Sequence, residues 1–265
     1  MQSFIYSLLI VILFVAQSMA QQVPPSYDTV LYLNPETPIY FKYIPAGTFS
    51  MGSNTEDGLA EKDEIPAHKV TLSKGFYMGV FEVTQAQWKA ITGENPAIFR
   101  VFEDSPNRPV EYVTWNQVDK YIEKLNELNL GKFRLPTEAE WEYACRAGTQ
   151  SPYYWGSEMA VNGSSEYAWP NSRSHSSTNP VGMKKPNAWG LYDMSGNVWE
   201  WCSDWYGPYS AEPKIDPTGP KKGKLKVFRG GSWFDFYESH RSANRHKHAP
   251  NEPYSAIGLR LVWEN

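Results

Sequence analysis

Cysteine is scarce in this 265-residue chain, which has only Cys145 and Cys202. Two cysteines exclude a small domain held together by several disulfides, although an exported protein can join them in one bridge. The sequence does not show whether they approach each other, so a single disulfide and two free thiols both stay open. No cysteine follows Cys202, which excludes a site built from thiolates in the C-terminal part of the chain.

Excess positive charge is also missing. The chain has 25 Lys and Arg against 29 Asp and Glu, a formal net charge of −4 at neutral pH. Broad nucleic-acid binding normally shows as a basic domain, so we expect no nucleic-acid partner. Beyond the N-terminal leader no stretch is apolar enough to cross a bilayer, so we expect no membrane span once the leader is removed.

The leader is the one long apolar run, residues 4–16, and it has the length of a signal-peptide core. Small residues at Ser18 and Ala20 predict cleavage after Ala20 and a secreted or periplasmic protein. No Lys or Arg precedes the run, so an uncleaved membrane anchor is the alternative. We divide the chain into a signal peptide (1–20), an N-terminal lead-in (21–38) and one domain (39–265).

Three segments begin with the same helix-start chemistry. A threonine stands three residues ahead of Gln or Glu at Thr84, Thr114 and Thr137, which is the pattern of a capping box. We expect helices over about 85–92, 115–129 and 138–146. The second places a set of apolar residues on one face: Val118, Tyr121, Ile122, Leu125 and Leu128.

Short strand-like runs and many turn residues surround these helices. Residues 39–44 and 48–52 flank Pro45-Ala46-Gly47, which predicts a β-hairpin. A last strand is expected over 257–262, and a long irregular loop over 150–186. With 19 Gly and 20 Pro, the composition favours a loop-rich α+β domain.

Tryptophans and acids alternate in the segment 187–207, which holds four of the eleven Trp. Rings at this density have to be buried, and a buried carboxylate needs a partner. Calcium is one such partner, because Asp193 and Glu200 bracket a turn whose carbonyls can point at the same place. Pairing of these acids with Arg229 or Arg260 is the alternative.

Five motifs in order resemble the formylglycine-generating enzyme family, also called sulfatase-modifying factors. They are residues 49–52, 134–142, 190–201, 229–233 and 258–260. The resemblance covers about residues 40–263 and implies a C-type-lectin-like fold with little regular secondary structure, stabilised by calcium. It also implies four calcium ligands: the side chains of Asp193 and Glu200 and the carbonyls of Gly196 and Val198.

The chain departs from the family at its active site. The resemblance implies that copper is held by two cysteines just after the Gly-Gly-Ser-aromatic motif, and copper(I) requires soft thiolates. Here the first position is Asp235, and no cysteine stands in 236–240, where the second belongs. We therefore expect no copper, with Ser232 and Trp199 left as walls of the site. A copper site made of Cys145 and Cys202 is the alternative.

The same region has the composition of a recognition surface, mixing rings, an amide and charges. It also lies where related lectin-fold variable proteins present their ligand-contacting residues. We expect an unknown protein or small-molecule ligand to contact Trp233, Asp235, Phe236, Tyr237, His240, Asn244 and Arg245. Trp233 and Phe234 are expected to be largely buried, and Phe236, Tyr237 and His240 to be exposed.

Two further sets of residues allow other chemistry. His240, His246 and His248 suit zinc or copper, although Lys247 repels a cation and a polar loop is the simpler interpretation. Ser232, His240 and Asp235 supply the residue types of a hydrolase, but no Gly-x-Ser-x-Gly pattern surrounds Ser232.

Three functions follow from this sequence. The preferred one is an exported, calcium-stabilised binding module without copper-thiolate activity. The second is an oxidoreductase of the same family that acts on a protein cysteine or a small molecule through another metal. The third is a structural subunit of a cell-envelope assembly.

Overall fold

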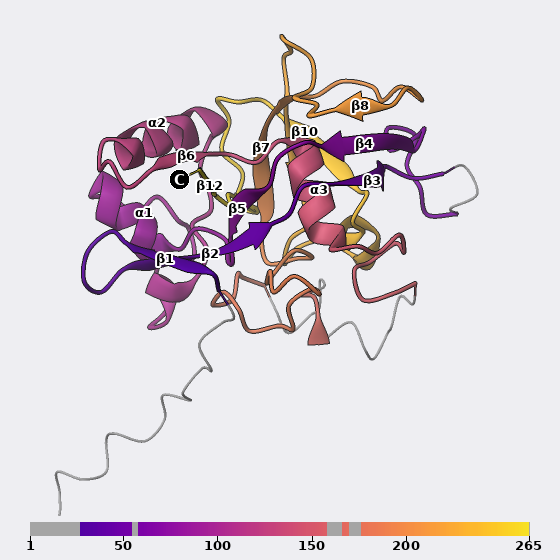
Figure 1. Ribbon diagram of the computed structural model, residues 1–265. Helices are drawn as coiled ribbons and strands as arrows, with labels where there is room; N and C mark the ends of the chain where they lie inside the picture. Colours follow the sequence, from indigo (N-terminus) through magenta and orange to yellow (C-terminus); the bar gives the residue numbers. More distant parts are fainter. Residues whose placement is uncertain (1–26, 55–57, 158–165, 170–175, 265) are drawn as a thin grey trace, which may run out of the picture.

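The computed structural model describes residues 27–54, 58–157, 166–169 and 176–264, so the predicted signal peptide lies outside it. Within these ranges the chain has few and short helices, surrounded by small sheets and long loops (Figure 1). The helices are α1 (Gln85–Thr92), α2 (Trp115–Asn126) and α3 (Glu138–Arg146), with the 3-10 turns η1 (Ser105–Asn107) and η3 (Tyr237–His240). None of the described helices is both long and apolar enough to cross a bilayer.

All three helix starts are confirmed. Thr84, Thr114 and Thr137 each accept a hydrogen bond from the third helical residue, whose side chain bonds back to the cap. The end of α2 was predicted too late. α2 ends at Asn126, whose side chain hydrogen-bonds to the backbone N–H and carbonyl of Phe133. Leu128 lies beyond the helix and is exposed, so it does not belong to the apolar face.

The strands form three sheets. The five-stranded sheet has the order β1-β2-β5-β12-β6, the four-stranded sheet β10-β9-β7-β11, and the three-stranded sheet β3-β4-β8. The strands are β1 (Thr29–Tyr32), β2 (Pro38–Ile44), β3 (Gly47–Met51), β4 (His68–Leu72), β5 (Phe76–Gly79), β6 (Lys132–Arg134), β7 (Trp199–Trp205), β8 (Lys214–Ile215), β9 (Lys226–Arg229), β10 (Arg245–His248), β11 (Ile257–Gly258) and β12 (Val262–Glu264). Thus part of the expected lead-in forms the edge strand β1, and the expected last strand is split in two.

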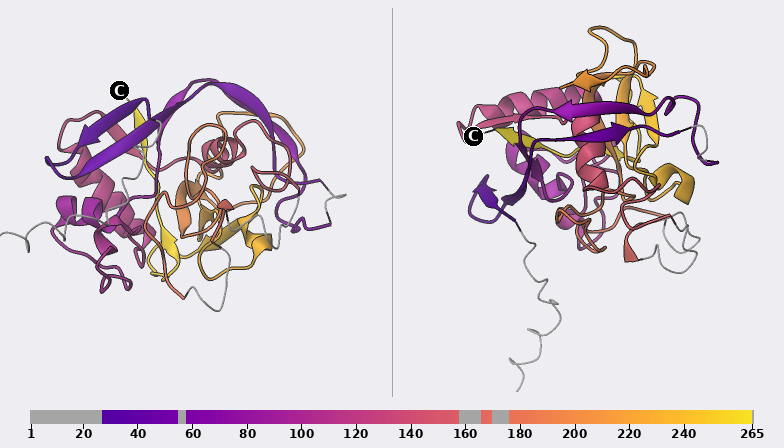
Figure 2. Two further views of the ribbon diagram at one scale, coloured as in Figure 1. Left: turned by 90° about the horizontal axis from the view of Figure 1, so that it is seen from below. Right: turned by 45° about the vertical axis from the view of Figure 1, so that its right-hand side comes forward.

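The predicted hairpin of β2 and β3 is wrong. β2 pairs with β1 and β5, whereas β3 pairs with β4. Figure 2 shows these N-terminal strands arching across the molecule from the α1–α2 side to the α3 side. β2 contributes to both hydrophobic cores, with Phe41 in the core of α2 and Ile44 in the core of α3, whereas Phe49 and Met51 of β3 belong to the core of α3 alone.

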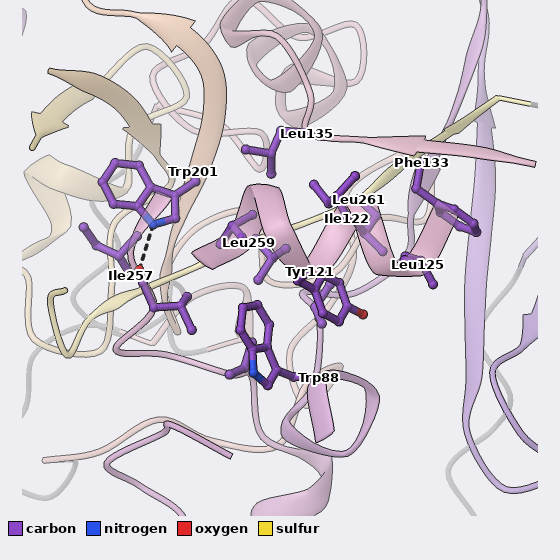
Figure 3. Packing of buried hydrophobic residues seen from close by; sticks show 14 of the residues in the cluster. Trp88, Tyr121, Ile122, Leu125, Phe133, Leu135, Trp201, Ile257, Leu259 and Leu261 are labelled. Carbon is purple, nitrogen blue, oxygen red and sulfur yellow. Dashed lines mark hydrogen bonds between the residues drawn. The ribbon is translucent and has the colours of Figure 1, made fainter. Parts of the chain in front are cut away.

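Tryptophan burial in the segment 187–207 is confirmed at its centre. Trp199 and Trp201 are buried in β7, which lies between β9 and β11. Consecutive residues of β7 are buried on both faces, so the sequence shows no alternation there. In the larger core Trp201 donates to the Val113 carbonyl, and Trp88 stacks on Tyr121 at 4.6 Å between ring centroids (Figure 3).

The long loop is also confirmed. Among the described residues, no α-helix or strand lies between the end of α3 and the start of β7. Stacked rings hold part of this loop: Trp155 lies between Tyr153 and Tyr167, with centroid distances of 4.6 and 5.5 Å. The loop reaches the turn that precedes β7, where the first candidate site lies.

Candidate functional site

Three buried carboxylates surround one guanidinium beneath the turn before β7. Glu82, Asp193, Glu200 and Arg260 are each at most 2% exposed. Arg260 Nη2 lies 2.6 Å from Glu200 Oε1, and Trp141 Nε1 donates to Glu200 Oε2 at 2.6 Å. The alternative partner that the sequence offered for Glu200, an arginine, is therefore present in the structure.

Asp193 has one oxygen with a partner and one without. Its Oδ2 accepts from the Gly182 amide at 2.6 Å, whereas Oδ1 is buried and has no hydrogen-bond partner among the described residues. Burial raises the pKa of Asp193 to about 6, although the Gly182 bond and Arg260 oppose the rise. An orphaned carboxylate oxygen in a buried site is costly unless a cation or a proton satisfies it.

Glu82 belongs to this acid cluster and was missed from the sequence. Its carboxylate accepts from the Val198 amide at 3.0 Å and from Asn197 Nδ2 at 2.7 Å, so it holds the turn from below. Burial raises the pKa of Glu82 well above its ordinary value, and Asp193 and Glu200 raise it further. The available signal was an acid between Phe81 and Val83, in an otherwise apolar run.

The residues present fit a hard cation in part. Asp193 offers a free buried oxygen, but the contacts of the Glu200 carboxylate come from Arg260 and Trp141. Among the described residues no three His, Cys, Asp or Glu side chains are placed to hold a metal. A calcium ion at this turn would therefore depend on main-chain oxygens, as predicted for Gly196 and Val198.

Two hydrogen bonds hold Asp235 against the residues that precede it and against β7. Its Oδ2 accepts from Trp199 Nε1 at 2.8 Å and from the Ser232 hydroxyl. His240 Nε2 meets the Ser232 carbonyl at 3.1 Å and not the hydroxyl. The geometry therefore does not assemble a Ser-His-Asp relay, and the Asp235 carboxylate holds the Trp199 ring and the turn together.

Exposure around Asp235 differs from what the sequence suggested. Phe236 is 69% exposed, as predicted, but Phe234 is 54% exposed and Trp233 only half-buried. His240 is fully buried, so its predicted exposure is wrong. The η3 turn directs its ring beneath Gly231, where an added Cβ would lie 2.4 Å from the ring. Burial lowers the pKa of His240, which favours the neutral ring.

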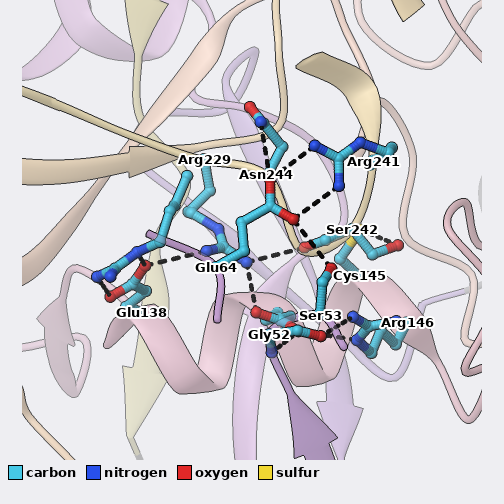
Figure 4. Close-up of polar contacts among 12 residues, drawn as sticks. Gly52, Ser53, Glu64, Glu138, Cys145, Arg146, Arg229, Arg241, Ser242 and Asn244 are labelled. Atoms are coloured by element: carbon cyan, nitrogen blue, oxygen red, sulfur yellow. Dashed lines mark hydrogen bonds and ion pairs between the residues drawn. The ribbon is translucent and has the colours of Figure 1, made fainter. Parts of the chain in front are cut away.

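Asn244 and Arg245, expected on the recognition surface, are buried as well. Arg245 Nη2 lies 2.6 Å from Glu138 Oε2, and Asn244 donates to Glu64 Oε1 at 3.1 Å. Figure 4 shows Asn244 among the buried arginines and carboxylates beneath this segment. Of the predicted surface only Phe236 is therefore exposed, and Trp233, Asp235 and Tyr237 are half-buried, so the predicted exposure of Tyr237 is only partly met.

Both cysteines are free and buried, so the disulfide alternative is not present. Cys145 in α3 contacts the Met194 carbonyl and the Ser242 hydroxyl, each at 3.6 Å. Burial raises the pKa of Cys145 to about 12 and that of Cys202 well above its usual range, which opposes thiolate formation. Neither sulfur is accessible as a ligand for a redox metal at the surface.

The histidines near the C-terminus do not gather. His246 is exposed and packs on the rings of Trp199 and Phe228, with centroid distances of 5.0 and 5.7 Å. His248 lies 3.7 Å from Glu252. These contacts give each ring a packing or pairing role of its own.

The fold and the turn before β7 define a sulfatase-modifying factor domain. The model of the sulfatase-modifying factor enzyme 1-like domain matches residues 36–265, and the chain belongs to this family. The chain is 30% identical in sequence to the formylglycine-generating enzyme of Streptomyces coelicolor. The match covers 83% of this chain and 87% of that protein.

Two solved structures share the fold over most of their length. Variable protein 1 of Treponema denticola is 31% identical, with a TM-score of 0.79 over 91% of this chain and 100% of that one. PvdO from Pseudomonas aeruginosa is 28% identical, with a TM-score of 0.75 over 91% and 99%. The predicted α+β fold of the formylglycine-generating family, low in regular secondary structure, is thereby confirmed.

Proposed function

We propose that this chain is an exported binding domain of the family that lacks copper-thiolate oxidation. The observation that carries the proposal is the role of Asp235. The family resemblance implies a cysteine at this position, and here the carboxylate accepts hydrogen bonds from Trp199 and Ser232. A carboxylate is a hard ligand that suits copper(I) poorly.

The binding surface is the exposed segment around Asp235. Phe234 and Phe236 expose most of their rings, and Trp233 packs edge-on against Phe99 at a centroid distance of 5.2 Å. Exposed rings on a backbone fixed by hydrogen bonds bury large area at little entropic cost when a partner binds. A protein or small molecule with an apolar contact face fits this surface.

Removal of calcium is the first test. Adding calcium at a hundred times its dissociation constant is expected to raise the melting temperature by about 5–10 °C relative to a chelator, because the ion binds only the folded turn. The Asp193→Ala variant is expected to lose this increase, since Asp193 carries the free oxygen. An equal increase in wild type and Asp193→Ala would place the ion elsewhere, and no increase in wild type would overturn calcium stabilisation.

Peptide oxidation tests the absence of copper chemistry. The purified chain, supplied with copper and a cysteine peptide of sulfatase type, is expected to form no aldehyde above the level without protein. The Streptomyces coelicolor enzyme serves as the positive control under the same conditions. Aldehyde formation that depends on this protein would overturn the proposal, and it would favour the alternative of an oxidoreductase using another ligand set.

The proposal that the protein is exported rests on the predicted leader alone. Expression of the full chain with a C-terminal tag in a bacterial host, followed by fractionation and N-terminal sequencing, tests it. We expect a periplasmic product that begins at Gln21. A product that keeps Met1 in the membrane fraction would instead show the uncleaved anchor.

A further inference from the structure

A cavity of about 340 Å³ lies at the N-terminal end of α3, away from the exposed rings around Asp235. Its walls come from β3, β4, the start of α3, the end of β7, the loops on both sides of β8 and the start of β10. Apolar wall atoms come from Met51, Tyr209, Pro217 and Pro220, among others. This volume is within the range of small-molecule sites, about 300–1,000 Å³.

A single carboxylate oxygen in this cavity lacks a partner. Asp204, which is 4% exposed, lines the cavity and uses Oδ2 to accept from the Glu138 amide at 3.1 Å and from Ser203 Oγ at 2.9 Å. Within the part of the chain that the structure describes, no hydrogen-bond donor reaches Oδ1. Oδ1 is not one of the enclosed polar atoms without a partner, so it is open to the cavity and can accept a hydrogen bond from a ligand.

The neighbouring acid does not compete for a ligand. Glu138 also lines the cavity, but both its oxygens are taken: Arg245 bonds to both, and Arg229 and Tyr209 bond to Oε1. Burial raises the pKa of Asp204 to about 7, and the carboxylates of Glu138 and Glu140 raise it further. The cations near Asp204 are Lys226, which donates to the Ser203 carbonyl, and Arg245, which is paired with Glu138. Lys214 and His68 also line the cavity. No hydrogen bond or ion pair joins any of these four side chains to Oδ1 among the described residues, so Oδ1 can accept from a positively charged donor.

The loop above Asp204 is shaped to leave this oxygen open. Gly219 has a left-handed φ of +70°, and a Cβ there would lie 3.1 Å from Asp204 Oδ1. Only glycine combines that backbone conformation with free space beside the carboxylate. The exposed Thr218 next to it lies at the mouth of the cavity.

We propose that this cavity binds a small primary ammonium compound with an apolar body. The ammonium donates to Asp204 Oδ1, and the apolar body packs on Tyr209 and the prolines of the loop. A metal ion is a weaker fit, because no three His, Cys, Asp or Glu side chains of the described residues converge here. The site is independent of the C-terminal surface, so its failure would leave the proposed function untouched.

Calorimetric titration of the full chain with benzylamine tests the proposal, with benzyl alcohol as the uncharged probe of similar size. We expect benzylamine to bind about ten-fold or more tightly than benzyl alcohol at pH 8, because a charge-assisted hydrogen bond is worth more than a neutral one. Its affinity should fall between pH 8 and pH 6, as Asp204 takes up a proton. Equal affinities of the two probes would overturn the proposal.

Variants distinguish binding in the cavity from unspecific attraction of the amine to acidic side chains elsewhere on the protein. Asp204→Asn should abolish the preference for benzylamine, whereas Glu123→Gln, which removes one exposed carboxylate on α2, should keep it. Thr218→Trp at the mouth should weaken both probes without touching the core, which keeps the test valid if Asp204→Asn folds poorly. Unchanged benzylamine affinity in Thr218→Trp, or in a folded Asp204→Asn, would show that the amine binds elsewhere.

Discussion

An Arg229→Met variant is expected to lose about 3–5 kcal/mol of folding free energy, because it leaves buried carboxylates without their partner. Arg229 is fully buried, with Nη1 2.9 Å from Glu138 Oε1 and Nη2 2.5 Å from Glu142 Oε2. Methionine fills a similar length but donates no hydrogen bond. Glu138 retains Arg245, whereas Glu142 retains only Arg146 as a charged partner.

Urea unfolding at neutral pH measures this loss. Arg100→Met is the matched control, because Arg100 is exposed and its bonds go to the carbonyls of Asn95 and Ala97. It should change the free energy of unfolding by less than about 1 kcal/mol. Adding Glu142→Gln to Arg229→Met should recover part of the loss. If Arg229→Met costs no more than Arg100→Met, the buried network does not stabilise the fold.

The second large effect is expected at Arg260, and it depends on pH. An Arg260→Met variant leaves Glu82, Asp193 and Glu200 together without a guanidinium. In the wild type the pKa of Glu82 and that of Asp193 are already raised, the latter to about 6, although Arg260 lowers both. Removing Arg260 raises them further, so the folded variant holds protons that the unfolded chain releases.

The direction in which the stability of the variant changes with pH follows from this proton uptake. Folding stability from a carboxyl with a raised pKa is fully present below its unfolded pKa, about 4, and is lost as pH rises through the folded value. Arg260→Met should therefore cost about 3–5 kcal/mol at pH 8 and clearly less at pH 5. Urea unfolding in the presence of a chelator measures both values. A cost that is equal at the two pH values would contradict the clustering of these acids.

The parts of the fold that the sequence predicted correctly are those determined by interactions between residues close together in the chain. The starts of α1, α2 and α3 depend on a threonine and a residue three positions later, and all were predicted correctly. β2 pairs with its neighbour in the chain, Thr29–Tyr32, on one side and with the more distant Phe76–Gly79 on the other. The predicted hairpin is absent because β1 and β5 occupy the two edges of β2, and β3 pairs with β4 instead.

The candidate site divides in the same way. The chemistry of Asp193 and Glu200 was readable from their aromatic surroundings, and the structure brings both into one buried cluster. The third acid, Glu82, comes from a distant segment and gave only a weak signal. The burial of His240 was not predictable, because the direction of a side chain leaving a 3-10 turn has no period in the sequence.

The position of β12 in the five-stranded sheet has a consequence for how the chain matures. β12 pairs with both β5 and β6, although long stretches of chain separate it from each of them. The sheet therefore cannot close during synthesis until the residues after Arg260 have left the ribosome. Contacts of such long sequence separation form slowly, so this sheet is expected to be completed late in folding, after the helices and the local hairpins.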